Sequence, residues 1–278
     1  MKHRAICPLA LSSTAVALTS ALVLSGCGSP RPQRITLTGS STVAPLVNEI
    51  GKQFERQNPG WRVDMQMGGS SRGIADARSG TAMVGMVSRA LKADESDLQS
   101  RTIALDGVAL IVNSANPVKT LNDAQIRGIY TGKLRNWAEV GGKTAPITVV
   151  NKAEGRSTLE LFLKHFKLEA NQVKASVVIG DNQQGILTVS KDPNAIGYVS
   201  IGTAGYEAAH GAAIKLLPLE GVPATLAAVK DGRYPLARPL NLVTKPNPSA
   251  AVQRFLDYAS SAQVDGLIEK QFFVVPHR

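Results

Sequence analysis

Hydrophobic and polar positions alternate along the chain in two periods, one typical of strands and one typical of helices. Residues 63–67 alternate as a strand does, and 108–112 is a continuous apolar run of the kind found in buried parallel strands. Residues 159–166 repeat at helical spacing. Further strands are expected at 35–37, 83–87, 147–150, 177–179, 196–199, 214–217 and 240–243, and further helices at 43–54, 74–78, 123–130 and 252–259. Strands that alternate with helices predict an α/β fold with βαβ units.

The amino-terminal residues have a different pattern. Lys2 and Arg4 precede the uncharged stretch 5–24, which is the order of a secretory signal peptide. About 20 uncharged residues could also span a bilayer, but Pro8 and the many Ser and Thr residues disfavour that alternative. We therefore expect residues 1–26 to be a signal peptide, followed by a short polar tether over 27–34.

The end of this segment, Leu24-Ser25-Gly26-Cys27, resembles the lipobox of bacterial lipoproteins. The resemblance implies that Cys27 is lipidated and that the protein is exported and anchored to a membrane. More than one acyl chain gives lasting anchorage. The chain has two cysteines, and the other one, Cys7, lies in the predicted signal peptide. No disulfide and no cysteine-based metal site or nucleophile is therefore expected in the mature domain.

Composition and charge narrow the classes of ligand. A chain of 278 residues is long enough for one large domain or two modest ones. The formal net charge is +10, and removing Lys2 and Arg4 leaves +8 on the mature chain. The basic residues are scattered singly, without the runs or aromatic interleaving of nucleic-acid binders. A small anion is thus a better ligand candidate than nucleic acid.

Three turns rich in Ser, Thr and Gly each lie between a predicted strand and a predicted helix. They are 38–42, 68–73 and 154–158, and the last places Ser157 and Glu160 at capping-box spacing. The first turn of a helix offers unpaired N–H groups and a partial positive charge, so it holds anions. Ser and Thr are also ordinary helix caps, and the spacing does not show that the three turns converge.

An enzyme is the alternative from another class. Gly69-Ser70-Ser71-Arg72-Gly73 matches the G-x-S-x-G nucleophile elbow of hydrolases, with Ser71 as nucleophile and His210 as the one suitable histidine. The motif is short, so we favour a binding protein over an enzyme. No Walker A phosphate loop and no His, Asp and Glu spacing typical of a metal site is present, so no metal and no cofactor are expected.

The chain from about residue 35 onward resembles the PstS family of phosphate-binding proteins, which are lipid-anchored or periplasmic type 2 binding proteins of the phosphate ABC importer. The segments that carry the resemblance are 39–45, 69–73, 85–89, 106–109, 155–158 and 234–240. The resemblance implies two α/β lobes, 34–110 plus 239–278 and 111–238, with hinge strands near 109–112 and 238–243.

The same resemblance implies a phosphate site between the lobes, a permease pair with its ATPase as partner, and a monomeric chain. The implied phosphate-binding residues are Ser41, Thr42, Val43, Ser70, Ser88, Arg89, Asp106, Lys152, Arg156, Ser157 and Thr158. Lys152 stands where many members carry Arg, so Arg156 is a candidate for that Arg's role.

The choice of anion depends on a carboxylate. Phosphate near neutral pH can carry a proton that sulfate lacks, so an acceptor carboxylate in the site favours phosphate. Some members place an Asp beside Ser88, where this chain has Arg89. Asp106 is our candidate for this function, with Glu154 in reserve, although Asp106 could also be a turn residue. Sulfate or molybdate remains the alternative ligand, and phosphate sensing the alternative to transport.

Overall fold

A mixed sheet of nine strands runs through residues 32–277, which are the residues that the computed structural model describes. The strands are β1 (Gln33–Gly39), β2 (Trp61–Met67), β3 (Val84–Val87), β4 (Gln99–Asn113), β5 (Thr148–Lys152), β6 (Val177–Ile179), β7 (Ala195–Ser200), β8 (Ile214–Leu216) and β9 (Ala237–Thr244). The helices are α1 (Ala44–Gln57), α2 (Ser70–Ser79), α3 (Asp123–Tyr130), α4 (Ser157–Phe166), α5 (Asn182–Lys191), α6 (Ile201–Ala209), α7 (Leu226–Lys230), α8 (Ala250–Ala259) and α9 (Asp265–Lys270). The expected α/β class is confirmed.

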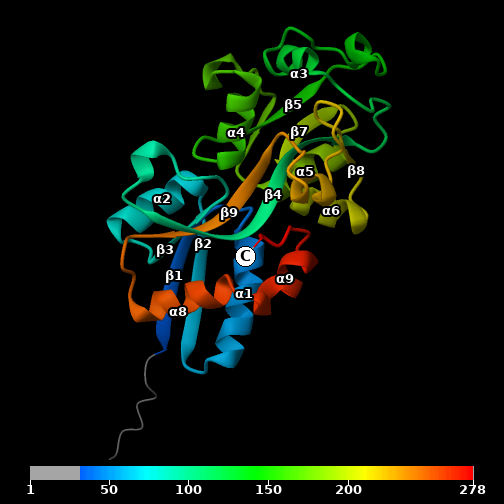
Figure 1. The fold of residues 1–278 in the computed structure, drawn as a ribbon. Helices are drawn as coiled ribbons and strands as arrows, with labels where there is room; N and C mark the ends of the chain where they lie inside the picture. Colours follow the sequence, from blue (N-terminus) through cyan, green and yellow to red (C-terminus); the bar gives the residue numbers. More distant parts are fainter. Residues whose placement is uncertain (1–31, 278) are drawn as a thin grey trace, which may run out of the picture. The chain divides into compact units, whose positions relative to one another are not determined.

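Two antiparallel strands, β4 and β9, link the two halves of the sheet (Figure 1). Eight strands follow the order β2-β1-β3-β9-β4-β7-β5-β6, and the ninth, β8, pairs with β4 outside this order. β4 pairs with β9 up to Gly107 and with β7 from Val108 onward. β9 in turn pairs with β3 in the first half. The two-lobed arrangement with two linking strands is therefore confirmed, and the exact lobe boundaries remain a prediction.

The direction of the apolar run at 108–112 was predicted wrongly. This run pairs antiparallel with β7 and β8, whereas its composition indicated a parallel strand. Its residues are divided between two hydrophobic clusters, with Ile111 in one and the other four in the second. A continuous apolar run indicates that both faces of a strand are buried, and this is true here. It does not indicate whether the neighbouring strands are parallel or antiparallel.

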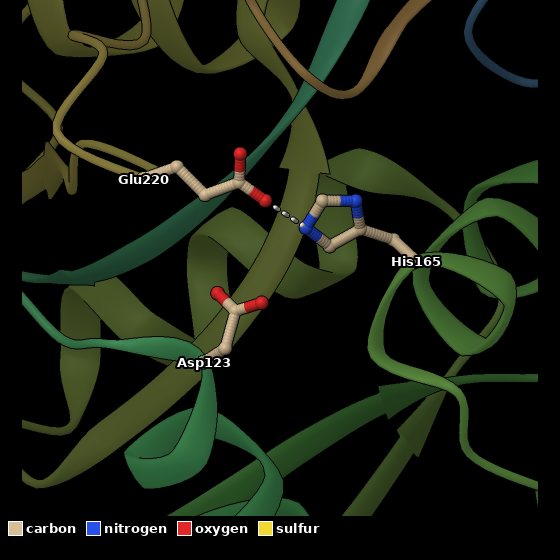
Figure 2. A group of neighbouring side chains, drawn as sticks. All are labelled: Asp123, His165 and Glu220. Carbon is tan, nitrogen blue, oxygen red and sulfur yellow. Dashed lines mark ion pairs between the residues drawn. The ribbon is translucent and has the colours of Figure 1, made fainter.

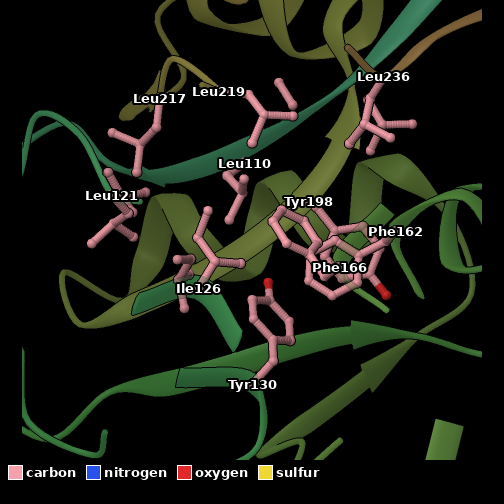
Figure 3. Packing of buried hydrophobic residues seen from close by; sticks show 14 of the residues in the cluster. Leu110, Leu121, Ile126, Tyr130, Phe162, Phe166, Tyr198, Leu217, Leu219 and Leu236 are labelled. Atoms are coloured by element: carbon pink, nitrogen blue, oxygen red, sulfur yellow. The ribbon is translucent and has the colours of Figure 1, made fainter. Parts of the chain in front are cut away.

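Each lobe has its own hydrophobic core. In the first lobe, α1 and α8 pack on β1, β3 and β9 around Phe54, which lies edge-on to Phe255 at 5.3 Å between ring centroids. In the second lobe, Phe162 of α4 stacks on Tyr198 of β7 with centroids 4.0 Å apart (Figure 3). Separate cores allow the two lobes to move as units about the linking strands.

Some elements escaped the sequence patterns. Helices α5, α6, α7 and α9 were not predicted. The first of them, α5, reads as a polar segment with Asn and Gln in its first turn. α2 begins at Ser70, four residues earlier than its apolar positions indicated. Among the helices of residues 32–277, none is long and apolar enough to cross a membrane. The predicted signal peptide and Cys27 lie outside the described residues.

Candidate anion-binding site

The first turn connects β1 to α1 and presents its hydroxyls at the carboxyl end of the strand. Gly39 has a φ of 133°, and a Cβ there would lie 2.2 Å from the carbonyl oxygen of Met86, so only glycine fits. Ser40 Oγ accepts from the amide of Thr42 at 3.2 Å and donates to Ser88 Oγ at 3.0 Å. The turn therefore fixes Thr42, which is buried, at the start of α1.

The second turn connects β2 to α2 and lies against the third. Ser70 Oγ accepts from the amide of Ser88 at 3.1 Å, which joins this turn to the end of β3. The amide of Ser71 donates to the carbonyl of Gly155 at 3.2 Å. Gly69 allows this approach, since a Cβ on it would lie 2.6 Å from the same carbonyl. Two turns from opposite lobes are thus in direct backbone contact.

The third turn connects β5 to α4, and one expectation about it was wrong. α4 begins at Ser157 with Arg156 as its cap residue, and no side chain caps the helix, so the predicted capping box of Ser157 and Glu160 does not form. Ser157 Oγ and Arg156 Nε are instead buried without a hydrogen-bond partner. Buried polar atoms almost always have partners, so these two donors indicate a place for a ligand.

Arg238 of β9 joins the first and third turns and Ser88 at the end of β3, and the sequence reasoning missed it. Its guanidinium donates to Thr158 Oγ1 at 3.0 Å and to Thr42 Oγ1 at 3.3 Å, and it lies 3.4 Å from Ser88 Oγ. The side chain of Arg238 is 1% exposed, so this cation lies in a largely dry environment. The segment that contains it was part of the family resemblance, but a lone Arg before a Pro carries no signal of burial.

Asp106 holds Arg238 in place. Its Oδ2 accepts from Nε and Nη2 of Arg238 at 3.1 and 2.8 Å, and its Oδ1 accepts from the amide of Gly202 at 3.1 Å. The carboxylate is 0% exposed. An ionised carboxylate offers about four acceptor positions, of which these contacts use three. The structure thus places the predicted selectivity residue beside the central cation, with one acceptor position left.

Lys152 supplies a second buried cation. Its Nζ donates to Oδ1 of Asn182 at 3.0 Å, and Asn182 donates in turn to Thr42 Oγ1 at 3.0 Å. Burial is the main cause that lowers the pKa of Lys152 to about 7, with Asp181 opposing the shift and the charges of Arg238 and Arg156 adding to it. Asn182 was not predicted, although an Asp181 cap before a polar helix is a signal that could have located it.

The structure does not bring every predicted residue into this group. Arg89 lies next to Ser88, but its guanidinium pairs with Glu95 at 2.7 Å and with Glu160 at 3.1 Å. Ser41 belongs to the first turn, and Val43 follows it as the cap residue of α1, where its amide donates weakly to Ser40 Oγ at 3.4 Å. The reserve candidate Glu154 is exposed.

The hydrolase alternative finds no catalytic geometry. Ser71 Oγ donates to Oε1 of Glu160 at 3.2 Å, and His210 stacks on Tyr206 with its Nδ1 2.7 Å from the Tyr206 carbonyl oxygen. A nucleophilic serine requires a histidine within hydrogen-bond reach. Within residues 32–277, Ser71 makes no hydrogen bond to a histidine.

Glu160 connects the two lobes. It receives the hydroxyl of Ser71 and pairs with Arg89 at 3.1 Å and Lys92 at 2.8 Å, all three of which belong to the first lobe. Glu160 itself lies on α4 in the second lobe. These contacts hold the two lobes together beside the site.

Replacing Glu160 with glutamine is expected to speed ligand dissociation and weaken anion affinity about threefold to tenfold, because the closed form loses its charged contacts. Stopped-flow dissociation measures the rate. Glu269→Gln, an exposed change on α9, is the control and should leave the rate unchanged. Equal rates for Glu160→Gln and the unaltered chain would contradict a role for Glu160 in closure.

The arrangement as a whole is suited to a small oxyanion. Arg156 and Arg238 lie close enough to Lys152 for their charges to lower its pKa, and Asp106 and Asp181 are the facing carboxylates. Hydroxyls of Thr42, Ser157 and Thr158 surround them in buried positions. In such a dry environment charge-assisted hydrogen bonds to a bound anion are short and strong.

The chain is similar to known binding proteins over most of its length. A sequence model described as a PBP superfamily domain matches residues 27–263. The phosphate-binding protein PstS of Bacillus subtilis is 27% identical over 234 residues, which cover 83% of this chain and 76% of that protein. A phosphate ABC transporter substrate-binding protein of Clostridium perfringens, solved with bound phosphate, is 30% identical with a TM-score of 0.82, and the match covers 88% of this chain and 100% of that one. An ABC-type phosphate transport receptor of Vibrio cholerae is 29% identical with a TM-score of 0.72, covering 87% of this chain and 100% of that one.

Proposed function

The chain belongs to the PBP superfamily and within it to the PstS family of phosphate-binding proteins, and from this we propose that it binds inorganic phosphate between its lobes for an ABC importer. Its fold is that of the type 2 periplasmic binding proteins. One observation carries the proposal: Arg238 joins a helix-start turn of each lobe, at Thr42 and at Thr158, beside buried donors without partners.

The remaining parts of the proposal concern the protein's setting. Relatives that bind phosphate for a transporter support a binding protein rather than an enzyme. We propose that a lipid on Cys27 tethers the exported chain to the membrane, where a closed monomer meets the permease pair and its ATPase. The phosphate-bound relative and the closed contacts of Glu160 support delivery by lobe closure.

Titration calorimetry near pH 7 tests the ligand. Phosphate is expected to bind at least about tenfold more tightly than sulfate, because a protonated phosphate oxygen can donate where sulfate can only accept. Protein purified from cells should be unfolded and refolded first, so that any phosphate already bound is removed. Sulfate binding that equals or exceeds phosphate binding would overturn the phosphate assignment and favour another oxyanion.

Asp106→Asn tests the origin of that preference. We propose that the fourth acceptor position of Asp106 receives the proton of phosphate, so the asparagine variant should bind phosphate and sulfate with more similar affinities. Both affinities should also fall, since Asp106 orients Arg238. If both ligands weaken by the same factor, Asp106 only positions Arg238 and another group selects phosphate.

A further inference from the structure

Three side chains outside the anion site meet in the second lobe, although nothing in their sequence spacing indicated a cluster. Asp123, His165 and Glu220 each offer one ligand atom, and these three atoms lie within 4.8 Å of one another (Figure 2). Residues this far apart in the sequence come together only through the fold. The sequence expectation of no metal site rested on spacing and did not address such a cluster.

The backbone holds each of the three residues in a defined place. Asp123 begins α3, whose start is fixed by a reciprocal capping box between Asn122 and Gln125. His165 lies in the last turn of α4. Glu220 occupies a tight turn closed by two hydrogen bonds between Leu219 and Val222, of 3.0 and 2.8 Å. Preorganised ligand positions lower the entropic cost of binding a metal ion.

The positions and charges of the three side chains suit the coordination of a metal ion. Nε2 of His165 is buried and makes no hydrogen bond, although Oε1 of Glu220 lies 3.3 Å away. Two ligands about 2.0–2.1 Å from a tetrahedral zinc ion lie about 3.3 Å apart, which matches the separation of His165 Nε2 and Glu220 Oε1, while the Asp123 oxygen lies within 4.8 Å of both. Asp123 and Glu220 also place two carboxylates together, and the nearest cation of α3, Arg127, is 4.0 Å from Asp123.

We propose that Asp123, His165 and Glu220 bind a divalent transition-metal ion, and Zn²⁺ fits this ligand set best. One imidazole and two carboxylates suit a borderline cation, and the two negative charges balance it. The ion joins α3, α4 and the turn at Glu220, so it stabilises the second lobe. The site lies at the far end of α4 from Arg156 and Ser157, and it is separate from the anion site.

Zinc titration of the chelator-treated full chain in phosphate-free buffer tests the site. The isotherm should contain one binding site that disappears in His165→Gln and weakens at least about tenfold in Glu220→Gln. His210→Gln, which changes an exposed histidine of the same lobe, is the matched control and should leave that site intact. His3, Cys7 and Cys27 are present in every protein compared, so zinc bound to them does not alter the difference.

Two further readouts separate a metal site from a simple ion pair. Anomalous scattering at the zinc edge should give a peak among the three side chains, and phosphate affinity should be the same in His165→Gln as in the unaltered chain. Identical zinc isotherms for the unaltered chain and His165→Gln, or an anomalous peak elsewhere, would overturn the proposal. In that case the cluster is a contact between α4 and the Glu220 turn.

Discussion

Phosphate affinity should fall at least about 100-fold when Arg238 is replaced by glutamine, because hydrogen bonds to a charged group contribute about 1.5–3 kcal/mol each. Arg238 donates to hydroxyls of the first and third turns, and its side chain is 1% exposed. A glutamine cannot reach both turns and carries no charge. Titration calorimetry with phosphate measures the loss.

The same substitution should also destabilise the fold, since it leaves Asp106 buried without its cation. Removing one partner of a buried ion pair costs about 3–5 kcal/mol, which urea unfolding can measure. The double variant Arg238→Gln with Asp106→Asn should recover much of that stability but none of the affinity. This outcome separates the loss of binding from the loss of folding.

Arg72→Gln provides the matched control. Arg72 is exposed on α2, where it pairs with Asp76 at 3.1 Å. Its loss should change phosphate affinity by less than about threefold and the free energy of unfolding by less than about 0.5 kcal/mol. Full phosphate affinity in Arg238→Gln would contradict the central position assigned to Arg238.

The sequence predicted the parts of the site that have a local signature. Turns at 38–42, 68–73 and 154–158 were recognisable because glycine, hydroxyl residues and a following apolar repeat occur together. The fold class could likewise be predicted from alternating strand and helix periods. Both features depend on residues close together in the chain.

The missed residues depend on long-range contacts. Arg238 reaches Thr42 and Thr158, which are far from it in the sequence, so its burial could not be inferred from its neighbours. Arg89 had the residue type of an anion ligand, but Glu95 and Glu160 occupy its guanidinium. The direction of the 108–112 strand was also invisible, because apolar composition reports burial and not pairing.

Lys152→Met should make the ligand-free protein more stable and a poorer phosphate binder. Burial lowers the pKa of Lys152 from 10.5 to about 7, so the folded protein resists charging this amine. Between pH 7 and pH 10.5 the amine is protonated in the unfolded chain but not in the folded one, so stability rises with pH. Below about pH 7 the amine is charged in both states, and the folded protein bears the full free-energy cost of a buried charge. The variant should therefore gain a few kcal/mol near pH 6, a gain that shrinks toward pH 10.

Phosphate affinity should change with pH in the opposite direction to stability. A bound anion stabilises the protonated amine, so phosphate favours the charged form of Lys152 and its affinity should fall as pH rises above about 7. Phosphate itself also titrates near pH 7, but this effect cancels in the ratio of the dissociation constant of Lys152→Met to that of the unaltered chain. That ratio should decrease by up to about tenfold per pH unit above pH 7. Lys164→Met, an exposed change on α4, is the control and should give a ratio near one at every pH. A constant ratio for Lys152→Met from pH 6 to 9 would show that the Lys152 amine gains no proton when phosphate binds.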